Sequence, residues 1–157
     1  MFEGVRRSYL LLVYYMIEVI KELGTDPSLK MLETAAEGQA DVIARELRKT
    51  MPKDLTPLET GEYIYMDFMS KTGAEVAVHR KDEKSVTFRI LRCPFYECFL
   101  DAGIDCGQFL NGLCSNMTLP SIQATINRFT PDLKLETIMV RETAEELCLE
   151  RITLHED

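Results

Sequence analysis

The hydrophobic period of the chain changes about half-way along, and this change most limits what the chain can fold into. In the first half, apolar residues recur every three or four positions, as in helices that bury one face. In the second half, they alternate with polar residues, as in strands that bury one face. Helices and strands in separate blocks favour an α+β fold with an antiparallel sheet.

Three helices are predicted in the first half. The first covers about residues 5–23 and is apolar nearly all the way round. Asp26-Pro27 pairs an N-cap residue with a proline at the first helical position, and this predicts a long amphipathic helix that ends near residue 51. Thr56-Pro57 repeats the pattern and predicts a third helix to about residue 70.

Two hairpins are predicted in the second half. The first pairs the strands around residues 76–78 and 86–90, and the second pairs residues 133–141 with 147–154. Short helices are expected between the hairpins, beginning at Pro94 and after Thr118. We therefore expect N-terminal helices packed on an antiparallel sheet of about four strands made of two hairpins, in one domain spanning residues 1–157.

Composition and charge exclude several classes of protein. Hydrophobic residues make up 46% of the 157 residues, and this fraction indicates a folded chain, because a disordered chain has few apolar residues. The net charge of −8, with scattered basic residues, predicts no nucleic-acid partner, since phosphates would be repelled. The apolar run Tyr9–Ile17 is broken by Glu18, so we expect no membrane span. An odd count of five cysteines predicts reduced thiols and a cytoplasmic protein.

The segment that begins at Cys93-Pro94 carries the strongest chemical signal. A thiol at a helix N-terminus lies near unpaired N–H groups and the positive end of the helix dipole, which stabilise the thiolate. Cys93 is therefore the candidate nucleophile. Glu97 lies one turn further along the same helix face, where a carboxylate can carry a proton to or from a substrate.

Other interpretations of these residues stay open. A cysteine is most often a small buried apolar residue, and the tyrosines and methionines near Tyr14 and Met66 fit a core as well as a ligand pocket. His79 is too far along its strand to pair with Cys93 as a base. The cysteine separations of 5, 8, 8 and 34 residues lack the close pairs of a zinc site, so we predict no metal, although three thiols on distant segments can converge.

Several short motifs resemble one family. They are Arg92-Cys93-Pro94-Phe95-Tyr96-Glu97, Leu113-Cys114, the segment 127–137 beginning Asn127-Arg128-Phe129, Cys148 in the last strand, and the opening helix with Tyr9-Leu10-Leu11-Leu12-Val13-Tyr14-Tyr15. Together they resemble the L-2-amino-thiazoline-4-carboxylate hydrolase family. They are also similar to the vinyl-reductase-like and methanogen output-domain modules, which bind small ligands.

The resemblance implies the hydrolysis of a small cyclic C–N compound of the 2-amino-thiazoline-4-carboxylate type. It implies Cys93, Glu97 and Cys148 as catalytic residues, with Cys114, Tyr96 and Asn116 binding the ligand. The alternative is a non-catalytic module that binds a small ligand or senses thiol redox state. The cofactor stays unknown, because the sequence indicates none in particular.

The first helix also predicts an assembly. It has no polar face between Leu10 and Ile17, and a surface helix of that kind would expose a large apolar patch. We expect either that the rest of the chain buries this helix or that a second copy covers it as a homodimer.

Overall fold

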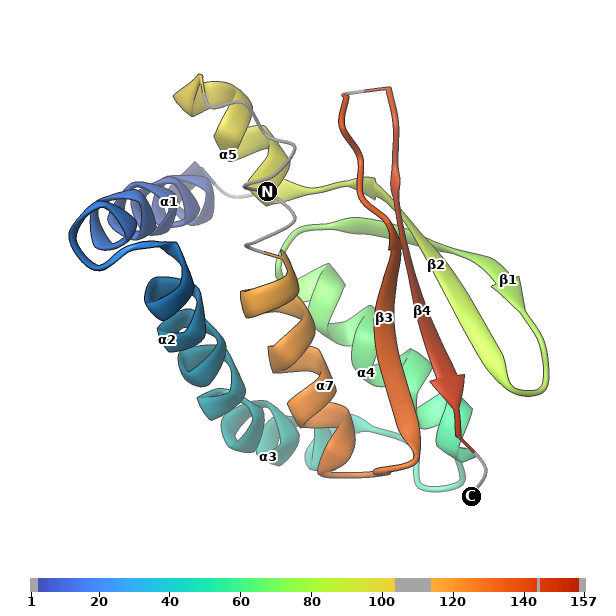
Figure 1. Cartoon of the computed structure of the whole chain (residues 1–157). Coiled ribbons are helices and arrows are strands. Elements are labelled where there is room, and N and C mark those ends of the chain that lie inside the picture. The colour runs from blue at the N-terminus through green and yellow to red at the C-terminus, as the bar shows by residue number, and fades with distance from the viewer. Residues whose placement is uncertain (1–2, 104–113, 144, 156–157) are drawn as a thin grey trace.

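The computed structural model describes residues 3–103, 114–143 and 145–155. Within them, helices precede a four-stranded antiparallel sheet, and shorter helices separate its two hairpins (Figure 1). This confirms the predicted α+β fold. The elements are, in chain order, α1 (Glu3–Leu23), α2 (Thr25–Gly38), α3 (Ala40–Thr50), α4 (Pro57–Lys71), β1 (Glu75–Lys81), β2 (Ser85–Arg92), α5 (Pro94–Ala102), the π-helical turn η1 (Cys114–Thr118), α7 (Leu119–Asn127), β3 (Leu133–Met139) and β4 (Cys148–Leu154).

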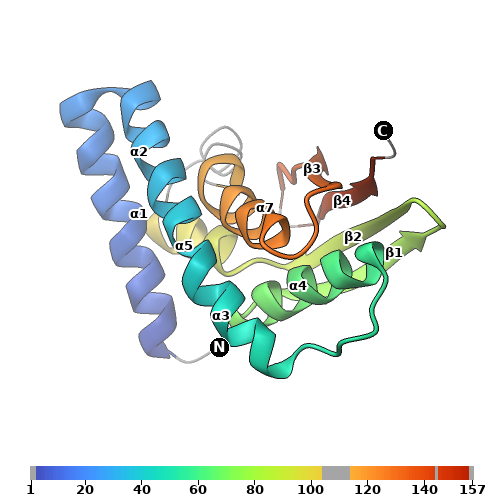
Figure 2. The same cartoon turned by 90° about the horizontal axis from the view of Figure 1, so that it is seen from below.

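The helices form layers on one face of the sheet. Figure 2 shows α4 and α7 against the sheet, with α2 and α3 outside them and α1 at the edge of the molecule. The contacts agree, since α4 and α7 both touch β3, α2 and α3 touch α7, and α1 touches α2 and α5. In the part of the chain that is described, no helix is both long enough and apolar enough to cross a bilayer.

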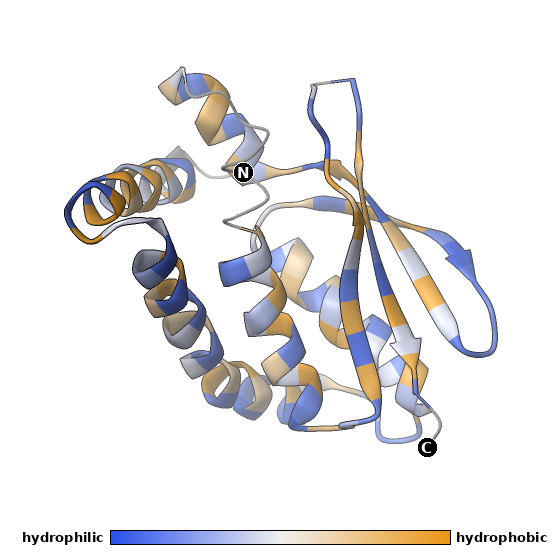
Figure 3. Cartoon of the chain, viewed as in Figure 1, coloured by the Kyte–Doolittle hydropathy of each residue, from blue (hydrophilic) through white to orange (hydrophobic). Residues whose placement is uncertain are grey.

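The sheet order β1-β2-β4-β3 joins the two hairpins through their inner strands. Residues opposite one another in an antiparallel pair share a face of the sheet. Ile90 lies opposite Cys148 and Phe88 lies opposite Glu150, so these four side chains lie on the face that the helices cover. Figure 3 shows the alternation of apolar and polar residues along β2 that produces this face.

The helix starts follow the sequence signals unevenly. Thr56 caps α4 as predicted, because its hydroxyl accepts from the Glu59 N–H while the Glu59 carboxylate accepts from the Thr56 N–H. The predicted cap at Asp26 is wrong, since α2 already begins at Thr25 with Gly24 before it. Thr118 makes no side-chain cap bond, because η1 runs directly into α7.

The long second helix predicted to end near residue 51 is divided in two. The division lies at Gln39, directly after Gly38, and the Gln39 N–H reaches back to the Ala36 carbonyl. Glycine is a poor helix former, and its cost weakens a helix where it stands. The break matters for the site, because it leaves Gln39 on the wall of a cavity.

Candidate functional site

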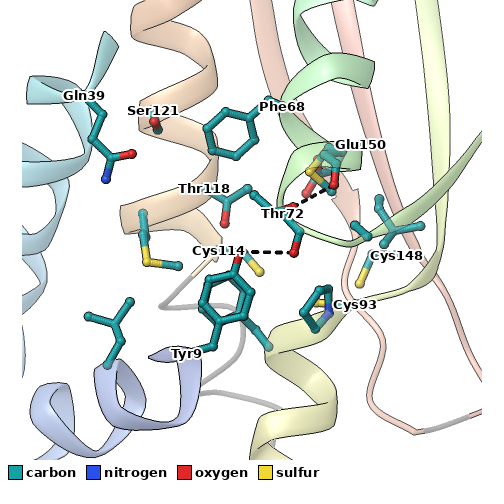
Figure 4. A pocket seen from close by; sticks show the side chains of 17 residues that line it. Tyr9, Gln39, Phe68, Thr72, Cys93, Cys114, Thr118, Ser121, Cys148 and Glu150 are labelled. Carbon is teal, nitrogen blue, oxygen red and sulfur yellow. Dashed lines mark hydrogen bonds between the residues drawn. The ribbon is translucent and has the colours of Figure 1, made fainter. Parts of the chain in front are cut away.

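A cavity of about 190 Å³ lies where the sheet, α1, α4, α5 and η1 meet (Figure 4). An engineered cavity of about 150 Å³ holds one benzene molecule, so this one has room for a single small ring with a substituent. Most of its wall is apolar. The lining residues are Tyr9, Leu12, Gln39, Phe68, Met69, Thr72, Ala74, Ile90, Cys93, Pro94, Phe95, Cys114, Met117, Thr118, Ser121, Cys148 and Glu150.

Three cysteines that are far apart in sequence meet at this cavity. Cys93 follows β2 and precedes α5, Cys114 opens η1, and Cys148 opens β4. All three are free thiols. The structure thus brings together the three cysteines that the sequence singled out, and their chemical roles stay a prediction. Cys106 lies outside the described residues.

The environment of Cys93 differs from the one expected at a helix start. Burial raises the pKa of the Cys93 thiol to about 11, although the N–H groups of Tyr96 and Phe95 pull in the opposite direction. Burial also raises the pKa of Cys114 well above its usual range. The expected stabilisation of the Cys93 thiolate is therefore wrong, because desolvation outweighs the helix N-terminus. Both thiols are protonated at neutral pH.

Glu97 does not line the cavity. Its carboxylate pairs with the Arg92 guanidinium, which donates from Nε to one oxygen and from the terminal nitrogen to the other at 3.1 Å. The hydrogen bond from Arg92 lowers the pKa of Glu97. This carboxylate is thus a partly exposed member of an ion pair on α5, and the structure places it apart from the thiols.

The two other predicted ligand-binding residues also lie off the cavity wall. Tyr96 is buried, and its ring packs under the guanidinium of Arg141 at 5.2 Å. Asn116 is half-buried in η1, and the wall there is formed by its neighbours Met117 and Thr118.

Glu150 is one of the site residues that the sequence analysis missed. It lies on β4, two positions after Cys148, and its side chain is only 4% exposed. The Tyr65 hydroxyl donates to its carboxyl group at 2.6 Å. Burial raises the pKa of Glu150 to about 7, and the bond from Tyr65 opposes part of this rise. An acidic residue between Cys148 and Ile152 on the buried face of a predicted strand was the available signal.

A buried arginine lies close to the thiols without reaching the cavity wall. Arg141 donates to the carbonyl oxygens of Ile90 and Leu91, and its charge acts to lower the pKa of Cys93 and Cys114. Its Nε has no hydrogen-bond partner among the described residues. The described part of the chain also holds no cluster of three or more cysteine, histidine or acidic residues placed to bind a metal ion.

Comparison with known proteins adds no relative to this picture. No protein-family model matches the chain, and no curated protein matches it.

Proposed function

We propose that this protein binds a small, ring-sized organic molecule in the cavity between its helices and its sheet. The observation that carries the proposal is the cavity itself, where three thiols and one carboxyl group from three separate segments meet on an otherwise apolar wall. Apolar walls with a few convergent polar groups are typical of small-molecule sites.

The thiol chemistry favours binding over nucleophilic catalysis. A nucleophilic cysteine reacts as the thiolate, and burial holds both Cys93 and Cys114 in the protonated form at neutral pH. Protonated cysteines behave as small, polarisable apolar groups. Of the two alternatives that the sequence left open, these pKa values support the ligand-binding module. A cytoplasmic location stays a prediction from the cysteine usage.

A cavity-filling substitution tests this proposal. Ala74 lies on the wall, and Ala74→Leu would place three more carbon atoms in the space. The NMR shifts of cavity residues report the binding of a ring-sized probe such as benzyl alcohol. Ala74→Leu should abolish this binding. The matched control is Ala35→Leu on the exposed side of α2, which should bind as the wild type does. Equal binding by both variants would contradict the proposal.

A hydrolase is the second candidate, and Glu150 is the observation that favours it. A carboxyl group with a pKa near 7 can both give and take a proton at neutral pH. If the protein hydrolyses 2-amino-thiazoline-4-carboxylate, as the family resemblance implies, the proton carrier should be Glu150 instead of Glu97. Turnover of that compound should then be abolished in Glu150→Gln and retained in Glu97→Gln. No turnover by the wild type would exclude this candidate.

A homodimer is also proposed, through the outer face of α1. The helix buries Val13 and Met16 against α5, but it leaves Leu11 70% and Tyr15 63% exposed. The other described residues therefore leave this face of the helix uncovered, and of the two expected ways of covering it we propose the second copy.

A further inference from the structure

The charged groups on the cavity wall favour a cationic ligand over an anionic one. Glu150 is the carboxyl group on the wall, and no lysine, arginine or histidine is among the described residues that line it. Arg141, whose charge acts on Cys93 and Cys114, donates to the carbonyl oxygens of Ile90 and Leu91 and does not line the cavity. A bound anion would meet a carboxyl group with no opposing charge, whereas a bound cation would meet a partner.

Glu150 has hydrogen-bonding capacity left for a ligand. A carboxylate accepts several hydrogen bonds, and the described residues give Glu150 a single one, from the Tyr65 hydroxyl. Tyr65 is held in place by stacking on Phe88, with ring centroids 4.0 Å apart. The carboxyl group is therefore fixed on one side and open to the cavity on the other.

Ser121 is a second polar group that the chain leaves unused. Its side chain lies on the cavity wall and is only 2% exposed, and its Oγ has no hydrogen-bond partner among the described residues. A buried hydroxyl without a partner costs free energy, so a partner from a ligand would be favourable. Figure 4 shows Ser121 and Glu150 on either side of Phe68, so the wall carries two separate polar points.

Aromatic rings form another part of the wall. Tyr9, Phe68 and Phe95 all line the cavity, and the rings of Tyr9 and Phe95 pack with centroids 4.6 Å apart. Aromatic faces attract organic cations and also cover the faces of flat rings.

On these grounds we propose that the ligand is a monocyclic organic amine, bound as its cation, with the ammonium group against Glu150 and a polar ring substituent against Ser121. This inference rests on the proposed binding function and names its ligand class. It predicts that Glu150 is ionised in the complex, since the cation favours the charged carboxylate.

Binding should therefore depend on pH. Glu150 takes up a proton below about pH 7, and protonation removes the charge that holds the amine. The groups that face Glu150 from the packed elements are hydroxyl, thiol and apolar groups, so none of them supplies a competing positive charge. They are Tyr65 from α4, Cys114 from η1, Cys148 on β4, Phe88 on β2 and Thr137 on β3.

The experiment compares three probes of one size: benzylamine, benzyl alcohol and benzoate. Calorimetry or NMR titration of the wild type at pH 8 should give benzylamine the lowest Kd, roughly tenfold below benzyl alcohol, and benzoate the weakest binding. The benzylamine Kd should rise about tenfold or more between pH 8 and pH 5.5, while the benzyl alcohol Kd stays constant. Benzyl alcohol or benzoate binding as tightly as benzylamine would overturn the amine assignment and leave the cavity proposal standing. No binding of any probe would refute both.

Variants then test the contact with Glu150. Glu150→Gln should raise the benzylamine Kd about tenfold to the level of benzyl alcohol, whose own Kd should change little. Glu97→Gln removes the carboxylate paired with Arg92 and should leave both constants unchanged. If Glu150→Gln does not fold, the probe order and pH dependence of the wild type decide the question. An unchanged preference for benzylamine in folded Glu150→Gln would refute the role of Glu150.

Discussion

Glu150 gives an otherwise apolar cavity wall one group that can carry a charge and accept hydrogen bonds. A carboxyl group in such surroundings shifts its pKa upward instead of carrying an unpaired charge. The Tyr65 hydroxyl occupies one of the positions at which the carboxylate can accept a hydrogen bond. The remaining positions are available to a ligand in the cavity. Burial raises the free energy of the ionised form of Glu150, and a bound cation would offset this cost.

The first prediction concerns stability and pH at this residue. The folded-state pKa of Glu150, about 7, lies above the value of roughly 4.3 in an unfolded chain. The folded state therefore holds a proton that the unfolded state releases, so its contribution to stability is complete below about pH 4 and is lost as the pH rises through 7. Urea unfolding at pH 5 and pH 8 should show that the wild type loses about 2.5 kcal/mol of unfolding free energy relative to Glu150→Gln over this interval.

The control for that measurement is Glu97→Gln. Arg92 lowers the pKa of Glu97, so this carboxylate stays ionised between pH 5 and pH 8 in both folded and unfolded chains. The difference between wild type and Glu97→Gln should not change over that interval. A constant difference between wild type and Glu150→Gln as well would show that Glu150 has an ordinary pKa.

The second prediction concerns the reactivity of Cys93. With a pKa of about 11, its thiolate fraction at pH 8 is roughly a hundredfold below that of an ordinary cysteine. Iodoacetamide labelling followed by mass spectrometry should therefore modify Cys93 about a hundred times more slowly in the folded protein than in guanidinium. Equal rates in the two states would show that the thiol is solvated with an ordinary pKa, and a faster rate in the folded protein would favour the nucleophile that the sequence suggested.

At the scale of elements, strands were easier to predict than the exact helix ends. The strand around Phe88 and the strand after Cys148 follow from alternation, and so does the convergence of their buried faces. The break at Gln39 directly follows Gly38, a local signal for a weakened helix that the apolar spacing on both sides of it masked. Likewise, Glu97 shares a helix with Cys93, but its partner Arg92 decides where the carboxylate points.

The third prediction concerns the contact of α4 with the sheet. A Cβ atom at Gly61 of α4 would lie 2.6 Å from Leu133 Cδ1 and 3.4 Å from Ile152 Cγ2. The glycine lets α4 approach β3 and β4 closely. Gly61→Val should lower the free energy of unfolding by about 2 kcal/mol, because overpacking outweighs the gain in helix propensity.

Gly38→Val is the matched control, since no atom lies within 4 Å of a Cβ at Gly38. Chemical denaturation should place this variant within about 0.5 kcal/mol of the wild type. A Gly61→Val protein as stable as the control would mean that α4 and the sheet separate easily to admit the extra methyl groups.

At the scale of the whole molecule, the cavity lies between two hydrophobic cores. One core joins the sheet to α4 and α7, and the other joins α1 to α5. Cys93 packs against both. Tyr9 of α1 closes the site from one side, and its hydroxyl donates to the Thr72 carbonyl at 3.1 Å. This position explains why short local motifs predicted the thiols around one pocket but not Glu150 on its wall, because the wall forms only where distant segments meet.

The last prediction concerns assembly of the whole molecule. Leu11 and Tyr15 lie one turn apart on the outer face of α1, and burying such side chains against a second copy removes apolar area from water. Sedimentation velocity at tens of micromolar should show a dimer for the wild type and a monomer for Leu11→Glu, because each interface would then bury two unpaired carboxylates. Met31→Glu on α2 introduces the same charge at another exposed apolar position, 59% exposed, and should stay dimeric. A wild-type monomer at every concentration would refute the homodimer, and a monomeric Met31→Glu would move the interface from α1 to α2.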